Sequence, residues 1–104
     1  MDNHGYPQEE EELRFLRELP TSDFEKNSKV IISMFENTGY GKGWIEKIID
    51  DFGDSIWELR LVTGGWSGCE DMIGELRENY LWWGMFWYSI HRGGLFVFRS
   101  HKEM

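Results

Sequence analysis

Arginine and aromatic side chains occur together near the end of this sequence, in a combination typical of binding surfaces. The segment Tyr80–Arg99 holds eight of the chain's 17 aromatic residues together with Arg92 and Arg99. A third arginine, Arg60, lies in an earlier segment in which apolar and charged residues alternate. Rings interleaved with guanidinium groups stack the bases of single-stranded nucleic acids and form hot spots in protein interfaces. The alternative interpretation is plain solubilising charge at a sheet edge.

Side chains that could perform catalysis are few. Cys69 could pair with His91 or His101 as nucleophile and base, because the start of a helix lowers a thiol pKa. Cys69 also lies on the apolar stripe of its predicted helix, which favours a buried and unreactive thiol. No histidine, cysteine or acidic spacing matches a metal site. We therefore expect no catalytic residues, no cofactor, no metal and no enzymatic activity.

Two glycine-rich segments could present backbone N–H groups to an anion. The first, TGYGKGW at 38–44, does not match the phosphate-binding loop pattern, and its alternative is a turn between two helices. In the second, TGGWS at 63–67, Gly64 and Gly65 are expected to turn the chain. Ser67 and Glu70 then fit a capping box, so we interpret this segment as structural.

The overall charge narrows the choice of partner. The 104 residues carry a formal net charge of −8, although residues 80–104 hold one acid against three bases. Nucleic-acid binding depends on clustered lysine and arginine, so nucleic acid is the less favoured partner. One cysteine excludes an internal disulfide and fits a reducing cytoplasm. Neither a signal peptide nor a membrane span is expected.

Hydrophobic periodicity predicts a single α+β domain over residues 1–104. Residues 1–8 are expected to form a flexible tail, and residues 9–52 a helical part of three helices. The last of these, in GWIEKIIDDFGD at 43–54, carries a helical stripe of tryptophan, isoleucine and phenylalanine. It is expected to pack on the preceding helix as a hairpin.

Residues 56–100 are expected to form a β-α-β-β part. Alternation predicts a strand in SIWELRLV at 55–62, and a helix follows over 67–79. Two strands, Tyr80–Ile90 and Leu95–Ser100, are expected to form a hairpin, because Gly93 and Gly94 permit the positive φ that its turn requires. The predicted fold is therefore N-terminal helices and one later helix on a small, mostly antiparallel sheet of three strands.

The hairpin is expected to have a core face and a binding face. Trp83 and Trp87 are assigned to the core. The binding face is expected to combine aromatic residues of the first strand with nearby arginines: Trp82, Phe86, Tyr88, Arg60, Arg92 and Arg99. An exposed apolar patch of this kind needs a partner, and a second copy of the chain is one candidate because symmetric dimers are common.

Two motifs carry a resemblance to a known group of proteins. TGGWSGCEDMI at 63–73 and HRGGLFVF at 91–98, with the aromatic segment between them, resemble a pattern in small uncharacterised proteins of phages and prophages. The resemblance covers about the last half of the chain, Ile56 to Phe98, and departs from the pattern at His91 and Leu95. It implies a bacterial host cytoplasm and an accessory role, and it supplies no catalytic residue.

The sequence therefore favours a small acidic accessory protein that binds a protein of its host and inhibits or redirects it. The alternative is a nucleotide or single-stranded nucleic-acid binding module that uses the aromatic and arginine residues of the hairpin.

Overall fold

The chain folds as an α+β protein, as its periodicity predicts. The computed structural model describes residues 10–65 and 67–101, so the predicted tail lies outside the described residues. In chain order the elements are α1 (Glu10–Arg17), α2 (Phe24–Glu36), β1 (Lys42–Ile49), β2 (Ser55–Val62), α3 (Ser67–Glu78), α4 (Tyr80–Phe86), β3 (Trp87–His91) and β4 (Leu95–Arg99).

The four described strands form one antiparallel sheet in the order β1-β2-β4-β3. The prediction of three strands is wrong, because β1 occupies the segment expected to form a third helix. Its register runs without interruption from Lys42 opposite Val62 to Ile49 opposite Ser55. The apolar residues of KGWIEKII fit either one face of a helix or a strand with apolar residues on both faces. The segment forms a strand because it pairs with β2 along its whole length. The predicted helical part, 9–52, therefore contains a strand.

The segment from Tyr80 begins as a helix and not as a strand. The side chain of Asn79 accepts a hydrogen bond from the backbone N–H of Trp82 at 3.2 Å, which caps the start of α4. The side-chain nitrogen Nδ2 of Asn79 also donates to the carbonyl oxygens of Leu16 and Leu19. This buried residue thus connects α1 to α4, and the strand β3 begins only at Trp87.

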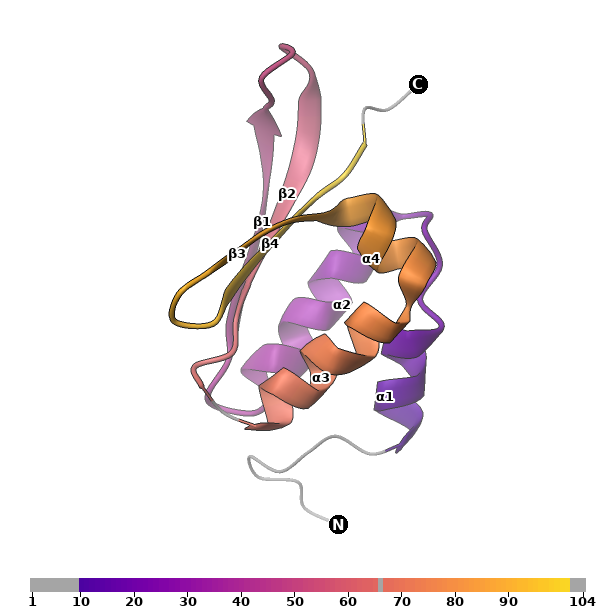
Figure 1. Cartoon of the computed structure of the whole chain (residues 1–104), viewed down its shortest axis with the longest axis vertical. Coiled ribbons are helices and arrows are strands. Elements are labelled where there is room, and N and C mark those ends of the chain that lie inside the picture. Colours follow the sequence, from indigo (N-terminus) through magenta and orange to yellow (C-terminus); the bar gives the residue numbers. More distant parts are fainter. Residues whose placement is uncertain (1–9, 66, 102–104) are drawn as a thin grey trace.

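The core lies between the helices and one face of the sheet (Figure 1). Trp82 is 1% exposed and packs against Phe24, Phe86 and Phe98, with ring centroids 6.2, 5.4 and 4.9 Å away. Truncating a tryptophan in such a site typically costs about 3–5 kcal/mol. This aromatic cluster therefore explains part of the unusual aromatic content of the segment.

The glycine-rich turns adopt the conformations expected of them. Gly64 and Gly65 have φ of 67° and 75°, and Gly93 and Gly94 have φ of 92° and 83°. Residues with a side chain rarely adopt these φ values, which is consistent with glycine at these four positions of the turns. Helix α3 begins at Ser67, directly after the undescribed residue 66, and Glu70 lies in its first turn. The capping role of Ser67 stays a prediction.

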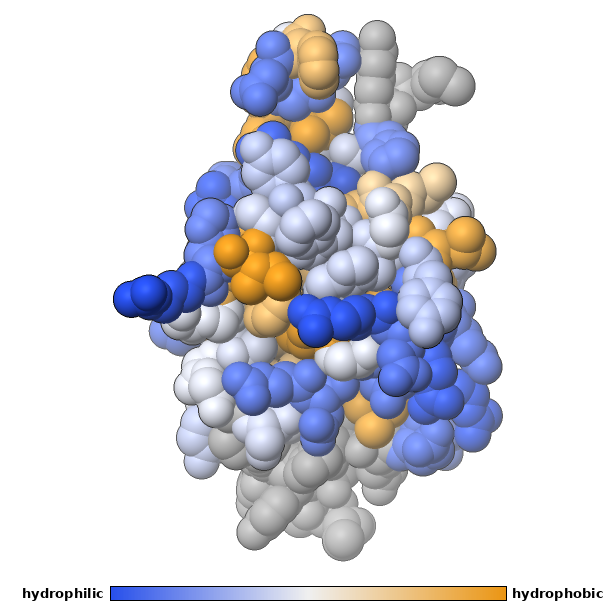
Figure 2. Space-filling model, viewed as in Figure 1, coloured by the Kyte–Doolittle hydropathy of each residue, from blue (hydrophilic) through white to orange (hydrophobic). Residues whose placement is uncertain are grey.

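The hairpin of β1 and β2 extends beyond the helices at the top of Figure 1. At its turn, Asp50 Oδ1 accepts hydrogen bonds from the backbone N–H groups of Phe52 and Asp54 at 2.9 and 2.8 Å. In the view of Figure 2, hydrophobic residues form separate patches among hydrophilic ones. Across residues 10–65 and 67–101, no helix has the length and apolar character needed to cross a membrane.

Candidate functional site on the uncovered sheet face

The helices cover one face of the sheet and leave the other uncovered (Figure 1). Side chains alternate between the two faces of a strand. Leu59, Leu61 and Phe98 belong to the core cluster, whereas the buried residues Ile56 and Val97 do not, which assigns the latter two to the opposite face. We call this the outer face. The strand registers place on it Lys42, Trp44, Glu46, Ile48, Ile56, Glu58, Arg60, Val62, Ser89, His91, Leu95, Val97 and Arg99. The contact with Arg99 places Tyr88 there as well.

A buried carboxylate lies at the centre of the outer face. Glu58 is only 2% exposed, and its Oε1 and Oε2 accept hydrogen bonds from Arg60 Nε and Arg99 Nε, both at 2.8 Å. Arg99 is directly opposite Glu58 in the register, and Arg60 follows two residues later on the same strand and face. A buried charge is tolerated only when it is paired and hydrogen-bonded. The Glu58 carboxylate therefore fixes the positions of two guanidinium groups.

Two aromatic side chains flank these arginines. The guanidinium carbon of Arg99 lies 3.8 Å from the ring centroid of Tyr88, within cation–π range. The register irregularity between Trp87 and Ser89 leaves Tyr88 as the extra residue of β3. On the opposite side, Trp44 is directly across from Arg60. Trp44 is 52% and Tyr88 49% exposed, so both rings are available for contact.

We refer to these five residues as the arginine–aromatic cluster: Trp44, Glu58, Arg60, Tyr88 and Arg99. The structure thus brings together three of the six residues predicted to bind, namely Arg60, Tyr88 and Arg99. Arg92 is exposed in the turn between β3 and β4, outside this cluster.

The other two predicted binding residues, Trp82 and Phe86, are buried, so the expectation that they are exposed is wrong. In a helix, residues four apart share a face, and α4 directs both into the core. The two residues predicted to lie in the core, Trp83 and Trp87, are more exposed than expected. Trp83 is half-buried, with the guanidinium of Arg77 4.9 Å from its ring, and Trp87 is 44% exposed. A dimer surface built on Trp82 and Phe86 is therefore excluded.

The sequence interpretation missed two members of the cluster. Glu58 is not among the residues predicted to bind, and Trp44 is predicted to lie on the apolar stripe of a helix. The available signal was the spacing Glu58-x-Arg60 in a predicted strand, because residues two apart share a face. The contribution of Arg99 depends on the pairing of β2 with β4, which no local pattern specifies.

The first glycine-rich segment forms a packed turn between a helix and a strand. The Thr38 hydroxyl donates to the carbonyl oxygen of Phe35 at 2.7 Å and accepts from the N–H groups of Tyr40 and Gly41 at 3.0 and 3.1 Å. A Cβ added at Gly41 would lie 2.7 Å from Cys69 Sγ. Two N–H groups that could have held a phosphate are therefore already used, and the expected turn between two helices connects α2 to β1 instead.

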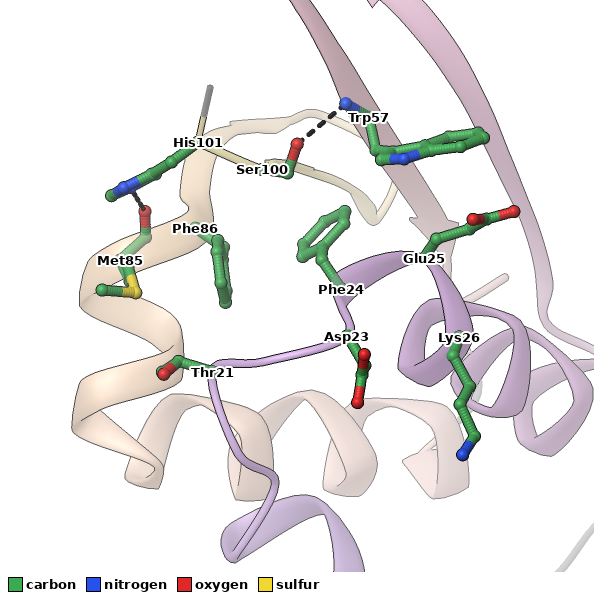
Figure 3. A pocket seen from close by; sticks show the side chains of 10 residues that line it. All are labelled: Thr21, Asp23, Phe24, Glu25, Lys26, Trp57, Met85, Phe86, Ser100 and His101. Atoms are coloured by element: carbon green, nitrogen blue, oxygen red, sulfur yellow. Dashed lines mark hydrogen bonds between the residues drawn. The ribbon is translucent and has the colours of Figure 1, made fainter. Parts of the chain in front are cut away.

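A pocket of about 490 Å³ lies near the start of α2 and the ends of α4 and β4 (Figure 3). Its walls are formed by Thr21, Asp23, Phe24, Glu25, Lys26, Trp57, Met85, Phe86, Ser100 and His101. Ser100 Oγ accepts from the N–H of Trp57 at 2.8 Å, and His101 Nε2 donates to the carbonyl oxygen of Met85 at 2.7 Å. The side chains of Asp23, Ser100 and His101 point in different directions in Figure 3, so they are not aligned as acid, nucleophile and base.

The proposed catalytic pairing of the cysteine does not form among the described residues. Cys69 is fully buried, and its Sγ lies 3.5 Å from the Thr38 hydroxyl. Burial raises the pKa of the Cys69 thiol, which keeps it protonated. His91 lies 2.9 Å from the Ser89 hydroxyl on β3, and His101 lies in the pocket. This geometry agrees with the interpretation of Cys69 as a packing residue.

No protein-family model, curated protein or solved structure matches the chain.

Proposed function

We propose that this protein acts by binding another protein through its outer face, with Trp44, Arg60, Tyr88 and Arg99 as the main contacts. The observation that carries the proposal is that exposed tryptophan and tyrosine rings flank two arginines whose positions are fixed by one buried carboxylate. Tryptophan, tyrosine and arginine dominate the hot spots of protein interfaces. An arginine already held in place also loses less conformational entropy when a partner binds.

The charge of the cluster supports a protein partner over a nucleic acid. Arg60 and Arg99 share Glu58, so the three side chains together carry a charge of only +1 (two positive and one negative). The whole chain carries −8. Binding to a phosphate backbone depends on uncompensated lysine and arginine. A protein surface with a few carboxylates around an apolar centre suits the cluster better.

The resemblance of the TGGWSGCEDMI and HRGGLFVF segments to phage and prophage proteins supports a bacterial host as the source of the partner. In this proposal the protein works in the host cytoplasm, where it inhibits or redirects a host factor. The small size of the domain and the burial of its single thiol fit an accessory role of this kind.

Affinity capture with matched tyrosine variants tests the proposal. Tagged wild-type protein, Tyr88→Ala and Tyr80→Ala are used to capture proteins from a bacterial lysate, and the bound proteins are quantified by mass spectrometry. Tyr80 is 83% exposed on α4, so its substitution removes an equally large exposed ring from another part of the surface. We expect a specific partner to be lost with Tyr88→Ala and retained with Tyr80→Ala. Equal retention by both variants contradicts the proposal.

A titration with fluorescent single-stranded oligonucleotides tests the alternative function, which is binding of single-stranded nucleic acid. We expect no binding at physiological salt. Binding that falls with rising salt and is lost in Arg60→Ala would instead support the nucleic-acid module.

A further inference from the structure

Among residues 10–65 and 67–101, the strand β1 lies at an edge of the sheet, and no other strand pairs with one side of its backbone. Within the described residues it pairs with β2 alone. At the hairpin turn the N–H of Asp50 donates to the carbonyl oxygen of Asp54 at 2.9 Å. In an antiparallel pair, every second residue of a strand directs its backbone N–H and C=O groups to the neighbouring strand. Because Asp50 bonds to the β2 side, the even-numbered residues of β1 also direct their backbone groups to β2. The odd-numbered residues Gly43, Ile45 and Lys47 therefore direct theirs to the free edge.

This edge lacks the features that commonly prevent pairing with another chain. The strand is eight residues long, contains no proline and keeps an unbroken register. Lys47, a residue type that often protects edges, has its Nζ 5.1 Å from the centroid of the Trp57 ring on the helix side. The opposite edge strand, β3, is only five residues long and carries the register irregularity. Of the two edges, β1 is the one open to another strand.

The outer-face residues of β1 are complementary to themselves. They read Lys42, Trp44 and Glu46, so charges of opposite sign lie at equal distances on either side of a tryptophan. If a second copy pairs antiparallel about Trp44, the two Trp44 rings are opposite each other. Each Lys42 is then opposite Glu46 of the other copy, giving two ion pairs across the strands. The same register places Gly43 of each copy opposite Ile45 of the other. Both residues direct their backbone groups to the free edge, so they can form the hydrogen bonds between the two strands.

Other registers lack this complementarity. Centring the pair on Glu46 places two glutamates opposite each other, and centring it on Lys42 or Lys47 places two lysines opposite each other. Centring it on Gly43 or Ile45 places no opposite charges of the strand across from each other. Charge complementarity therefore selects the register about Trp44.

We propose that the protein forms a homodimer in which the two β1 strands pair antiparallel about Trp44 and join the sheets into one of eight strands. Twofold symmetry makes this contact self-complementary and closes the assembly at two copies. The dimer would place the two outer faces side by side on one continuous sheet. Pairing of the two β1 strands requires no foreign partner.

Sedimentation equilibrium with charge-reversal variants tests the dimer. We expect the wild-type protein to reach twice the 12.4 kDa mass of one chain as its concentration rises. Lys42→Glu and Glu46→Lys each create two like-charge pairs, and each should weaken the dimer by about tenfold or more. The double variant restores opposite charges and should return the dissociation constant to within about threefold of the wild-type value. Both sites are exposed, and circular dichroism checks that each variant remains folded.

Arg92→Glu is the control, because it makes the same change in net charge as Lys42→Glu at the turn between β3 and β4. It should leave the dissociation constant unchanged. A wild-type protein that stays at one chain's mass up to hundreds of micromolar overturns the proposal. A dimer that neither single variant weakens, or that the double variant does not restore, also overturns it, because association would then use another surface or register.

Discussion

Replacing Glu58 with glutamine removes the charge that holds Arg60 and Arg99 on the outer face. The bond to Arg99 is 2.8 Å long and lies between a buried carboxylate and a side chain that is only a quarter exposed. Hydrogen bonds to charged groups contribute about 1.5–3 kcal/mol. The bond to Arg60 is equally short, but the Arg60 side chain is half exposed, so it contributes about 0–1 kcal/mol.

Glutamine keeps the shape of the side chain and one acceptor oxygen. We therefore expect Glu58→Gln to lower the free energy of unfolding by about 2–3 kcal/mol. This is a large share of the 5–15 kcal/mol that is typical of a domain. Urea unfolding followed by tryptophan fluorescence, at one fixed protein concentration, measures the change. Glu46→Gln is the matched control when the protein is dilute enough to be monomeric, because Glu46 is exposed and directly opposite Glu58 on β1, and it should then change stability by less than about 0.5 kcal/mol.

A double-mutant cycle with Arg99→Met identifies the origin of the loss. We expect a coupling energy between Glu58 and Arg99 of about 1 kcal/mol or more, because the two side chains share a hydrogen bond. If Glu58→Gln costs no more than Glu46→Gln, or if the coupling energy is zero, Glu58 does not hold the arginines and the reasoning fails.

Other substitutions should differ in their effect on stability according to whether the residue is buried and whether a larger side chain would fit. Trp82→Ala should lower the free energy of unfolding by about 3–5 kcal/mol, whereas Trp87→Ala should cost less than about 1 kcal/mol; thermal melts that give the reverse order would contradict the placement of α4. Gly64→Ala should cost more than Gly65→Ala, as measured by urea unfolding, because a Cβ at Gly64 alone would lie 2.6 Å from a backbone oxygen. Burial raises the pKa of Cys69, so its contribution to stability should be present at neutral pH and lost as the pH rises through the alkaline range. A thiol reagent should therefore modify Cys69 only after unfolding, and rapid labelling of the native protein would refute its burial.

The sequence predicted the elements whose local signals agree with one another. The alternation in SIWELRLV and the glycine pair Gly93-Gly94 specified β2 and the second hairpin, because strand periodicity and positive φ are local properties. The segments of β1 and α4 were misassigned because their patterns fit both element types. Contacts distant in sequence decide them: β1 pairs along β2, and Asn79 caps α4 while bonding to the end of α1.

The candidate site was predicted in part for the same reason. Arginine and aromatic residues in two strands indicated a binding surface, and Arg60, Tyr88 and Arg99 do lie together. The role of Glu58 could not be predicted from β2 alone, because it depends on the register between β2 and β4. Trp82 and Phe86 were assigned to the wrong side because a helix and a strand distribute the same residues differently.

Calorimetric titration with the captured host protein, once identified, tests the central proposal most directly. The protein partner is titrated with the wild-type chain, Arg60→Ala, Tyr88→Ala and the control Tyr80→Ala. The proposal predicts that Arg60→Ala or Tyr88→Ala weakens binding by about 2 kcal/mol or more, as at an interface hot spot, while Tyr80→Ala leaves the affinity unchanged. If both cluster variants bind as tightly as the wild type, the outer face is not the binding surface and the proposed function is contradicted.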